Sequence, residues 1–376
     1  MEKGNIMKIG IPKEIKPQEN RVSVLPSGVI NFVNEGHQVY VEKNAGVGSG
    51  FSDQEYIEAG AVILDSPKEV FEISEMIIKV KEPLEPEYAL LREDQILFTY
   101  LHLAPDVEQT KALIDSKCIA IAYETVQLEN GTLPLLAPMS AIAGRMSIQV
   151  GAYLLQKSNN GGGVLLGGVP GVEPGHVVIL GAGVVGLNAA QMAVGLGARV
   201  TIISKTTDEL SHAHDVLSSN VVTLISNNYN IRKSVIDADL VVGAASIPGA
   251  KAPKLVTEDM VMEMKSGSVL VDVAIDQGGS IETIDRTTNH DNPYYVKHGI
   301  VHYSVPNMPG AVPRTSSFAL SNATMPYALE IANKGAEKAM KENAALMKGL
   351  NVYKGKVTQL AVAEAQGLKY EAVSFC

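Results

Sequence analysis

The chain has 376 residues, with 31 Lys and Arg against 41 Asp and Glu, which gives a net charge of −10. This acidic balance argues against sequence-independent binding to nucleic acid or to an anionic membrane. With only two cysteines, a disulfide framework and a Cys-rich zinc site are excluded, so no metal is expected. The length predicts two domains, and the N-terminal residues lack a signal-peptide core, so the expected location is cytoplasmic.

The first 130 residues alternate short apolar runs with amphipathic segments, a pattern typical of β-α-β units around a parallel sheet. Strands are predicted at 8–11, 39–41, 76–80, 96–101 and 119–122. Helices are predicted at 27–34 and 107–115 and, after them, at about 140–156.

A second alternating series begins near residue 177. Strands are predicted at 177–180, 200–203, 240–242 and 268–273, and a helical pattern covers 324–350. The predicted fold class is therefore α/β with two doubly wound domains. Periodicity does not decide which domain the C-terminal helical segment joins.

The uncharged run 177–198 has the length of a membrane-spanning helix. It contains five glycines, and a strand, a glycine turn and a helix explain it better. Within it the apolar strand enters G-x-G-x-x-G at Gly181, Gly183 and Gly186, with a helix opening directly afterwards. In a dinucleotide site these glycines allow the turn, the approach of the pyrophosphate and the packing of the helix.

The third expected element is an acidic residue about 20 positions further on, which would accept hydrogen bonds from the adenosine ribose. Ser204 stands there, followed by Lys205, and Asp208 falls too late, in the next predicted helix. A small hydroxyl beside a cation removes repulsion toward a 2′-phosphate. These residues alone therefore favour NADP, which stays open beside NAD.

Charged residues near strand ends are the candidates for substrate chemistry. Lys79 and Lys81 alternate at the end of one predicted strand, so they would share a face, where a lysine can hold a carboxylate. His102 ends another strand, and histidine transfers protons near neutral pH, although a histidine in an apolar run is more often part of the core. Arg21, in a polar loop, would either fork onto a carboxylate or be solvated.

Two aspartates accompany the strand predicted at 268–273. Asp276 follows it, before a glycine pair, and is expected in the crevice at the end of the sheet. Asp272 lies within the strand, and a buried acid satisfied by backbone donors explains it better.

With these residues the chain closely resembles the bacterial L-alanine dehydrogenases, in the family that also holds the transhydrogenase alpha subunit. The shared segments, from residue 7 to about 370, are MKIGIPKE (7–14), NRV (20–22), KVKEP (79–83), YLHLA (100–104), PMS (138–140), GVPGV (168–172), PGAKAP (248–253), AIDQGG (274–279) and NMPGAVP (307–313). The resemblance implies reversible NAD-dependent oxidative deamination of L-alanine to pyruvate and ammonia. It also implies a homohexamer.

The resemblance further implies a Rossmann domain (135–311) inserted into a Rossmann-like substrate domain (1–134 and 312–376). Arg21 and Lys81 would bind the substrate carboxylate, His102 would donate and accept protons, and Asp276 would complete the polar centre. The expected cofactor contacts are Ser140, Gly181, Gly183, Val184, Val185, Gly186, Ser204, Lys205, Ser226, Ala245, Ser246, Val273, Ala274, Ile275, Asp276, Val305, Pro306, Asn307 and Met308.

Two departures from the family pattern lie in the cofactor half. Ser204 replaces the ribose-binding aspartate, and Ala245-Ser246 replaces the usual Val-Leu. One competing hypothesis is a nicotinamide-binding module of the transhydrogenase type, which lacks the Lys81-Glu82 and Leu101-His102-Leu103 motifs and normally joins membrane segments. The other is a regulatory protein that senses NAD, against which the intact candidate catalytic residues argue.

Overall fold

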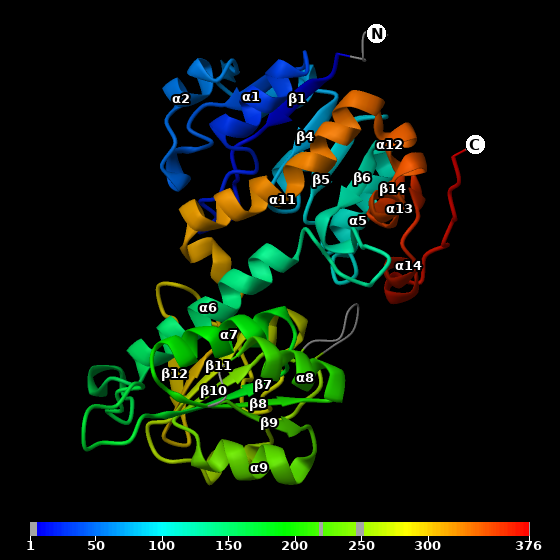
Figure 1. Ribbon diagram of the computed structural model, residues 1–376. Helices are drawn as coiled ribbons and strands as arrows, with labels where there is room; N and C mark the ends of the chain where they lie inside the picture. Colours follow the sequence, from blue (N-terminus) through cyan, green and yellow to red (C-terminus); the bar gives the residue numbers. More distant parts are fainter. Residues whose placement is uncertain (1–5, 218–220, 246–251, 376) are drawn as a thin grey trace. The chain divides into compact units, whose positions relative to one another are not determined.

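Two compact units make up the chain in the computed structural model, which describes residues 6–217, 221–245 and 252–375. Unit 1 combines Met1–Met139 with Gly310–Cys376, and unit 2 is the contiguous segment Ser140–Pro309 (Figure 1). Each unit is built on its own sheet.

The sheet of unit 1 has the strand order β15-β14-β6-β5-β4-β1-β2-β3. Its strands are β1 (Lys8–Ile11), β2 (Gln38–Glu42), β3 (Val62–Leu64), β4 (Met76–Ile78), β5 (Ile96–Thr99), β6 (Ile119–Ala122), β14 (Leu350–Tyr353) and β15 (Lys356–Val357). Strands β1 to β6 are parallel, and β14 pairs antiparallel with β6. The order reverses between β1 and β4, which is the kind of switch point where α/β sheets bind ligands.

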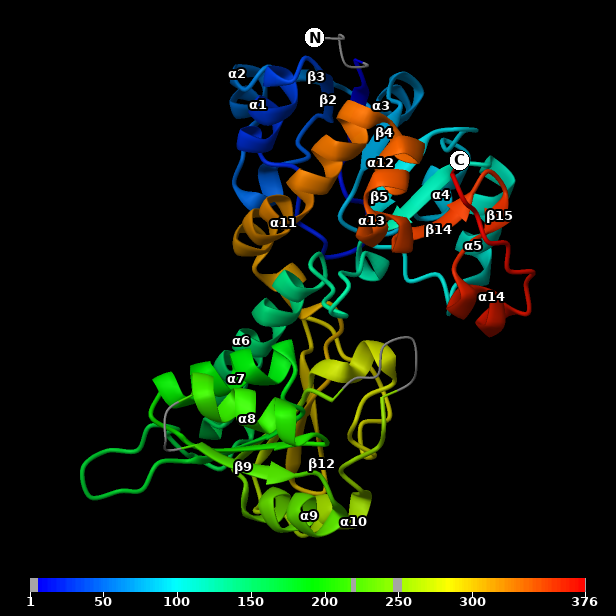
Figure 2. The same cartoon turned by 45° about the vertical axis from the view of Figure 1, so that its right-hand side comes forward.

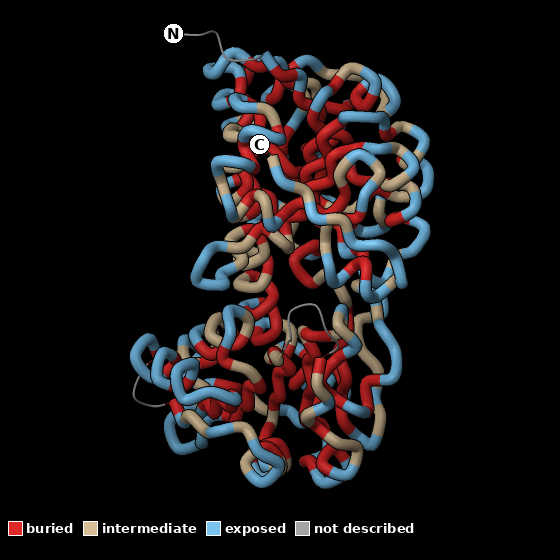
Figure 3. Tube along the Cα trace, turned by 90° about the vertical axis from the view of Figure 1, so that its right-hand side faces the viewer, coloured by how far each residue is buried: buried red, intermediate tan, exposed pale blue. Residues whose placement is uncertain are grey.

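The helices of unit 1 come from both ends of the chain. They are α1 (Pro26–Asn34), α2 (Asp53–Glu58), α3 (Pro67–Ile73), α4 (Glu85–Tyr88), α5 (Val107–Ser116), α11 (Pro313–Lys334), α12 (Ala336–Glu342), α13 (Ala344–Lys348) and α14 (Leu360–Gln366). Capping boxes on Ser52 and Ser66 begin α2 and α3. Strands β1, β4, β5 and β6 are almost entirely buried, and buried residues gather inside the part of the chain that carries both termini (Figure 3).

The sheet of unit 2 has the order β12-β13-β11-β10-β7-β8-β9. Its strands are β7 (His176–Leu180), β8 (Arg199–Ser204), β9 (Val221–Ile225), β10 (Leu240–Gly243), β11 (Val269–Asp272), β12 (Tyr294–Lys297) and β13 (Ile300–Tyr303). All are parallel except β12, and the order reverses between β7 and β10. This gives a second doubly wound sheet, so the predicted fold class is confirmed.

Helices cover both faces of this second sheet. They are α6 (Ala137–Leu154), which begins in unit 1, α7 (Val184–Gly195), α8 (Thr207–Val216), α9 (Asn228–Asp237) and α10 (Glu258–Met262). Helices α7 and α8 lie on one face, and α9 and α10 lie on the other (Figures 1 and 2).

Most of the predicted elements are present, including the strand, glycine turn and helix favoured for 177–198. The run 177–198 is β7, a glycine turn and α7, and no helix among the described residues is long and apolar enough to cross a membrane. Strands β4 and β5 end two residues earlier than predicted, at Ile78 and Thr99. The helical pattern at 324–350 is divided into α11, α12 and α13 by breaks at Gly335 and Asn343.

Candidate functional site

In unit 1 the predicted substrate residues follow the carboxyl ends of three neighbouring strands. Arg21 lies in the segment after β1, Lys81 three residues after β4, and His102 three residues after β5. Hydrogen bonds join these segments, since Ser23 Oγ donates to the Ile78 carbonyl (2.7 Å) and Thr99 Oγ1 donates to the Lys81 carbonyl (2.9 Å). The sheet therefore brings all three segments to one edge.

Arg21 is a buried side chain, not a solvated one. It is only 2% exposed and forms a two-point ion pair with Glu19, with Nε 2.6 Å from Oε1 and Nη2 2.5 Å from Oε2. Its Nη1 lies 3.2 Å from Sδ of Met139. Burial opposes the charge on Arg21, but the Glu19 carboxylate outweighs it and raises the pKa of the guanidinium above its usual value. Arg21 is therefore a fixed cation in a low-dielectric setting.

Lys79 and Lys81 occupy different environments, so the prediction that they share a strand face is wrong. Strand β4 ends before both of them, and Lys79 is fully buried, with Nζ 2.7 Å from Oε1 of Glu87 and 3.4 Å from Oε2 of Glu14. Glu14 also accepts the Val80 N–H at 2.6 Å. These carboxylates hold the chain from which the partly exposed Lys81 projects.

The buried Glu14–Lys79–Glu87 network is electrostatically coupled. Burial raises the pKa of Glu14 to about 7, with Lys79 lowering it only in part. Burial lowers the pKa of Lys79, but its two carboxylate partners raise it further, so the net direction is upward. Lys79 thus stays charged as a buried structural cation two residues before Lys81.

His102 is exposed on unit 1 and is held through its backbone. Its φ is +50°, and its N–H and that of Leu101 donate to Glu124 Oε1 at 2.6 and 3.1 Å. Its ring is stacked near that of Tyr100 at a centroid distance of 6.0 Å, and the Tyr100 hydroxyl donates to the Leu135 carbonyl (2.6 Å). The imidazole is thus presented to solvent from a fixed turn, which suits a proton carrier.

In unit 2 the three glycines of the turn differ in what a side chain would meet. Gly181 has φ +113°, and a Cβ there would lie 2.8 Å from the Ala244 backbone; at Gly186 it would lie 1.8 Å from the Gly181 carbonyl oxygen. A Cβ on Gly183 would meet nothing within 4 Å. Gly183 is the N-cap of α7, whose first N–H groups are available to an anion. The turn therefore fits a pyrophosphate.

The other predicted cofactor residues of unit 2 follow the carboxyl ends of the parallel strands. Val184 and Val185 open α7, and Ser204 ends β8 with Lys205 directly after it. Ser226 follows β9, and its N–H donates to the Ser204 carbonyl (2.7 Å). Ala245 follows β10, residues 273–276 follow β11, and residues 305–308 follow β13, where Val305 and Met308 are buried. Ser140 lies on α6, and Ser246 lies outside the described residues.

The two aspartates at the end of β11 have different environments, as expected. Asp276 is exposed, in the turn Val273–Gln277 that follows β11. Asp272 is fully buried and accepts the N–H groups of Ser280 (2.7 Å), Ile281 (3.0 Å) and Ala274 (3.1 Å). Asp272 is thus a structural acid that fixes the Asp276 turn.

Sequence reasoning missed five carboxylates that support these sites: Glu14, Glu19, Glu87, Glu124 and Glu209. Glu209, in the first turn of α8, accepts a hydrogen bond from Ser204 Oγ. The sequence signals for them were the two-residue spacing of Glu19 and Arg21 and the Thr-x-x-Glu pattern that Thr206 and Glu209 form at the start of a helix.

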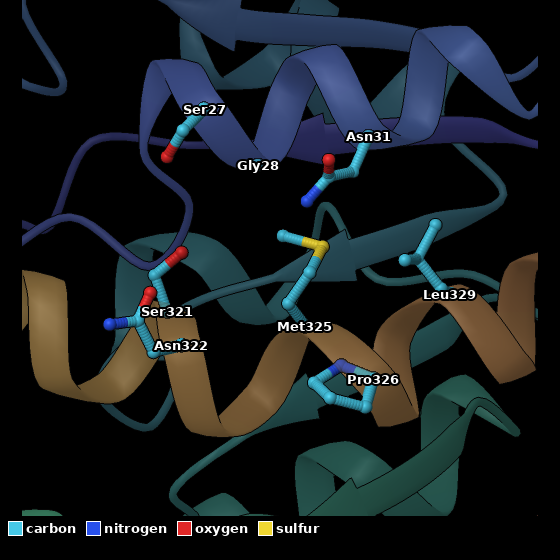
Figure 4. Close-up of a pocket in the computed structure, with 8 residues that line it drawn as sticks. All are labelled: Ser27, Gly28, Asn31, Ser321, Asn322, Met325, Pro326 and Leu329. Atoms are coloured by element: carbon cyan, nitrogen blue, oxygen red, sulfur yellow. The ribbon is translucent and has the colours of Figure 1, made fainter.

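Two other features lie apart from the predicted residues. A pocket between α1 and α11 is lined by Ser27, Gly28 and Asn31 and by residues of α11, and the Met325 side chain points toward Gly28 (Figure 4). It contains none of the predicted site residues. In the portion of the chain that the structure describes, no three His, Cys, Asp or Glu side chains are grouped as a metal site.

Two family models match the chain. The model described as alanine dehydrogenase/PNT, N-terminal domain, matches residues 10–143. The model described as alanine dehydrogenase/PNT, C-terminal domain, matches residues 147–360. Together they cover most of the chain, including both units.

Individual relatives and solved structures are also similar to this chain. An alanine dehydrogenase of Methanococcus maripaludis is 63% identical over 364 residues, covering 97% of this chain and 98% of its own. A solved L-alanine dehydrogenase has a TM-score of 0.93 at 52% identity, covering 96% of this chain and 99% of its own. A transhydrogenase from Sinorhizobium meliloti has a TM-score of 0.79 at 24% identity over 94% of this chain and 99% of its own, which shows a shared fold.

Proposed function

The chain belongs to the alanine dehydrogenase/PNT family, and from that premise we propose that it is an L-alanine dehydrogenase. The reaction is the reversible, NAD-dependent oxidative deamination of L-alanine to pyruvate and ammonia. Unit 1 is the substrate domain and unit 2 is the dinucleotide-binding domain. We further propose a cytoplasmic homohexamer, the assembly that the resemblance implies.

One observation carries this proposal. Arg21, Lys81 and His102 follow three neighbouring strands, β1, β4 and β5, at the carboxyl edge of one sheet. Two cations and a proton carrier are the groups that a small amino acid with a free carboxylate requires. The switch point between β1 and β4 is also where such a sheet is expected to bind its ligand.

Each substrate-site residue has a distinct role in the proposed reaction. Arg21, fixed by Glu19, and Lys81, carried on the segment that Glu14 and Glu87 hold, bind the substrate carboxylate by charge-assisted hydrogen bonds. His102 accepts and returns protons while water supplies the carbonyl oxygen and ammonia leaves, and the resemblance assigns Asp276 to the same polar centre. A bound nicotinamide would supply the acceptor for the substrate hydride.

The dinucleotide is held by the residues at the carboxyl edge of the unit 2 sheet. The α7 N-terminus and the space at Gly183 receive the pyrophosphate, while the 273–276 and 305–308 segments contact the nicotinamide half. NAD is the proposed cofactor in spite of the neutral Ser204. A nicotinamide-binding module without amino-acid chemistry is less well supported, since Lys81 and His102 would then have no role.

The test is absorbance at 340 nm with L-alanine and either NAD or NADP, run beside His102→Ala. We expect reduction of NAD by the wild type, and loss of at least about 100-fold in turnover for the variant, with NADH affinity unchanged. Light scattering measures the assembly separately. If neither cofactor is reduced while NADH still binds, the binding module is the correct function.

A further inference from the structure

Ser204 ends β8 beside the glycine turn. The Gly181 N–H donates to the Ile203 carbonyl (2.7 Å), and the Ser226 N–H donates to the Ser204 carbonyl (2.7 Å). In a dinucleotide-binding sheet the residue at this point faces the adenosine ribose, and NAD-binding proteins place an acid there. Ser204 is neutral and 5% exposed, so it supplies no charge of its own.

A carboxylate nevertheless lies at this point. Ser204 Oγ donates to Oε2 of Glu209, which stands five residues later in the first turn of α8. The helix sets this arrangement: Thr206 is the N-cap and accepts the Glu209 N–H (3.3 Å), while the next residue, Leu210, is buried. The serine hydroxyl thus ties a negative charge to the end of β8.

We infer that Glu209 is the ribose acceptor of this chain and the residue that selects NAD over NADP, an inference that rests on the proposed function. Ser204 occupies Oε2, and among the described residues no hydrogen bond is made to Oε1 of this exposed glutamate. A carboxylate oxygen accepts hydrogen bonds from ribose hydroxyls, whereas a 2′-phosphate beside it would be a like-charge contact. The acid of the usual motif is thus replaced by a serine–glutamate pair.

Lys205 is the residue that opposes this selection. Its ammonium would attract a 2′-phosphate, and it is the reason why the sequence alone favours NADP. Its side chain is exposed and forms no ion pair with any residue that the structure describes, so ordering it on a ligand costs side-chain entropy. Glu209 is already oriented by Ser204, so binding requires less ordering of its side chain than of Lys205. The carboxylate therefore determines the preference for NAD over NADP.

The experiment measures the Kd of NADH and of NADPH by fluorescence titration of the full-length protein without amino acid. Glu209→Gln removes the charge but keeps the shape of the side chain. Asp208→Asn is the matched control, because it removes one charge from the neighbouring exposed residue of the same helical turn. Thermal midpoints of all three proteins are compared, and we expect them to agree.

The wild type is expected to bind NADH at least about tenfold more tightly than NADPH. Glu209→Gln should reduce this ratio of Kd values by about tenfold, whereas Asp208→Asn should change it by no more than about twofold. Three results would each overturn the inference: an unchanged ratio of the two Kd values in Glu209→Gln, an equal effect of both variants, or a wild-type preference for NADPH. Turnover of L-alanine by the same protein would still support the proposed function. If the wild type bound neither dinucleotide, the proposed function would fail as well.

Discussion

Glu19 and Arg21 face each other in a closed, two-point ion pair, with distances of 2.6 and 2.5 Å, inside unit 1. Both side chains are almost completely buried, at 0% and 2% exposure. A buried guanidinium without a counter-charge would be costly, so Glu19 is the residue that allows a permanent cation to be kept at the edge of the sheet. We therefore expect that breaking the pair affects both folding and the proposed binding of the substrate carboxylate.

For Glu19→Gln we expect a loss of about 2–4 kcal/mol in the free energy of unfolding, because one partner of a buried pair is removed. The KM for pyruvate should rise by at least about tenfold as Arg21 loses its orientation, while the Kd of NADH stays the same. Denaturant unfolding and steady-state kinetics measure both effects. Glu58→Gln, an exposed acid on α2, is the control, and equal stabilities of the two variants would contradict the prediction.

Glu124 positions His102, and its removal should affect turnover. In Glu124→Ala the N–H groups of Leu101 and His102 lose their acceptor, so the left-handed turn at His102 relaxes. We expect kcat to fall by about 100-fold, less for Glu124→Gln, with NADH affinity unchanged. Rapid-mixing kinetics and fluorescence titration are the measurements. Glu129→Gln, an exposed acid nearby in sequence, should behave as wild type, and an Ala variant with normal kcat would refute the role.

Substitutions at two glycines of the turn should separate an effect on NADH affinity from an effect on folding. Gly183→Ala meets open space and has φ −72°, so its thermal midpoint should stay near that of the wild type while NADH affinity falls by about tenfold or more. Gly186→Ala would place a Cβ 1.8 Å from a backbone oxygen and should destabilise unit 2 by about 3 kcal/mol or more. Calorimetry and NADH titration check both. A stable Gly186→Ala protein, or unimpaired NADH binding by Gly183→Ala, would contradict this account.

The buried His302 on β13 makes stability depend on pH. Burial lowers its pKa to about 4 from 6.5, and its ring bonds to Thr283 Oγ1 (2.8 Å) and the Ile300 carbonyl (2.9 Å). The unfolded chain takes up this proton near pH 6.5 and the folded chain only near pH 4, so stability falls as the pH drops between these values, by up to about 3 kcal/mol.

His302→Gln removes that titration. Between pH 7 and pH 4.5 its denaturation midpoint should therefore fall less than that of the wild type. His212→Gln, an exposed histidine on α8, is the control and should follow the wild type. Parallel curves for the wild type and His302→Gln would show that His302 is not the group responsible.

Local sequence patterns were sufficient for many elements. Strands β1 and β6 have the predicted bounds, and the glycine turn lies between β7 and α7 as expected, because apolar runs and glycine spacing act over short distances. The early end of β4 could not be foreseen. It depends on Glu14, 66 residues away in the chain, which binds the Val80 N–H. Strand β14 likewise forms by pairing with β6, more than 220 residues earlier.

The candidate site shows the same division between local and distant information. The types of Arg21, Lys81 and His102 and their places near strand ends indicated the substrate chemistry. The carboxylates that support them could not be predicted from the sequence. Which acid pairs with which base or N–H group depends on the path of the backbone, and the spacing of residues in the sequence does not specify that path. Glu209 illustrates this, since its bond to Ser204 follows from where α8 begins.

The insertion of unit 2 within unit 1 has a consequence for synthesis on the ribosome. All of Ser140–Pro309 has been translated before Gly310–Cys376, which supplies α11 to α14 and the antiparallel partner of β6. Unit 2 can therefore complete its sheet while unit 1 still lacks a third of its residues, so the later-starting unit is the first to mature. Until β14 has been translated, β6 is an unprotected edge strand that can pair with another chain.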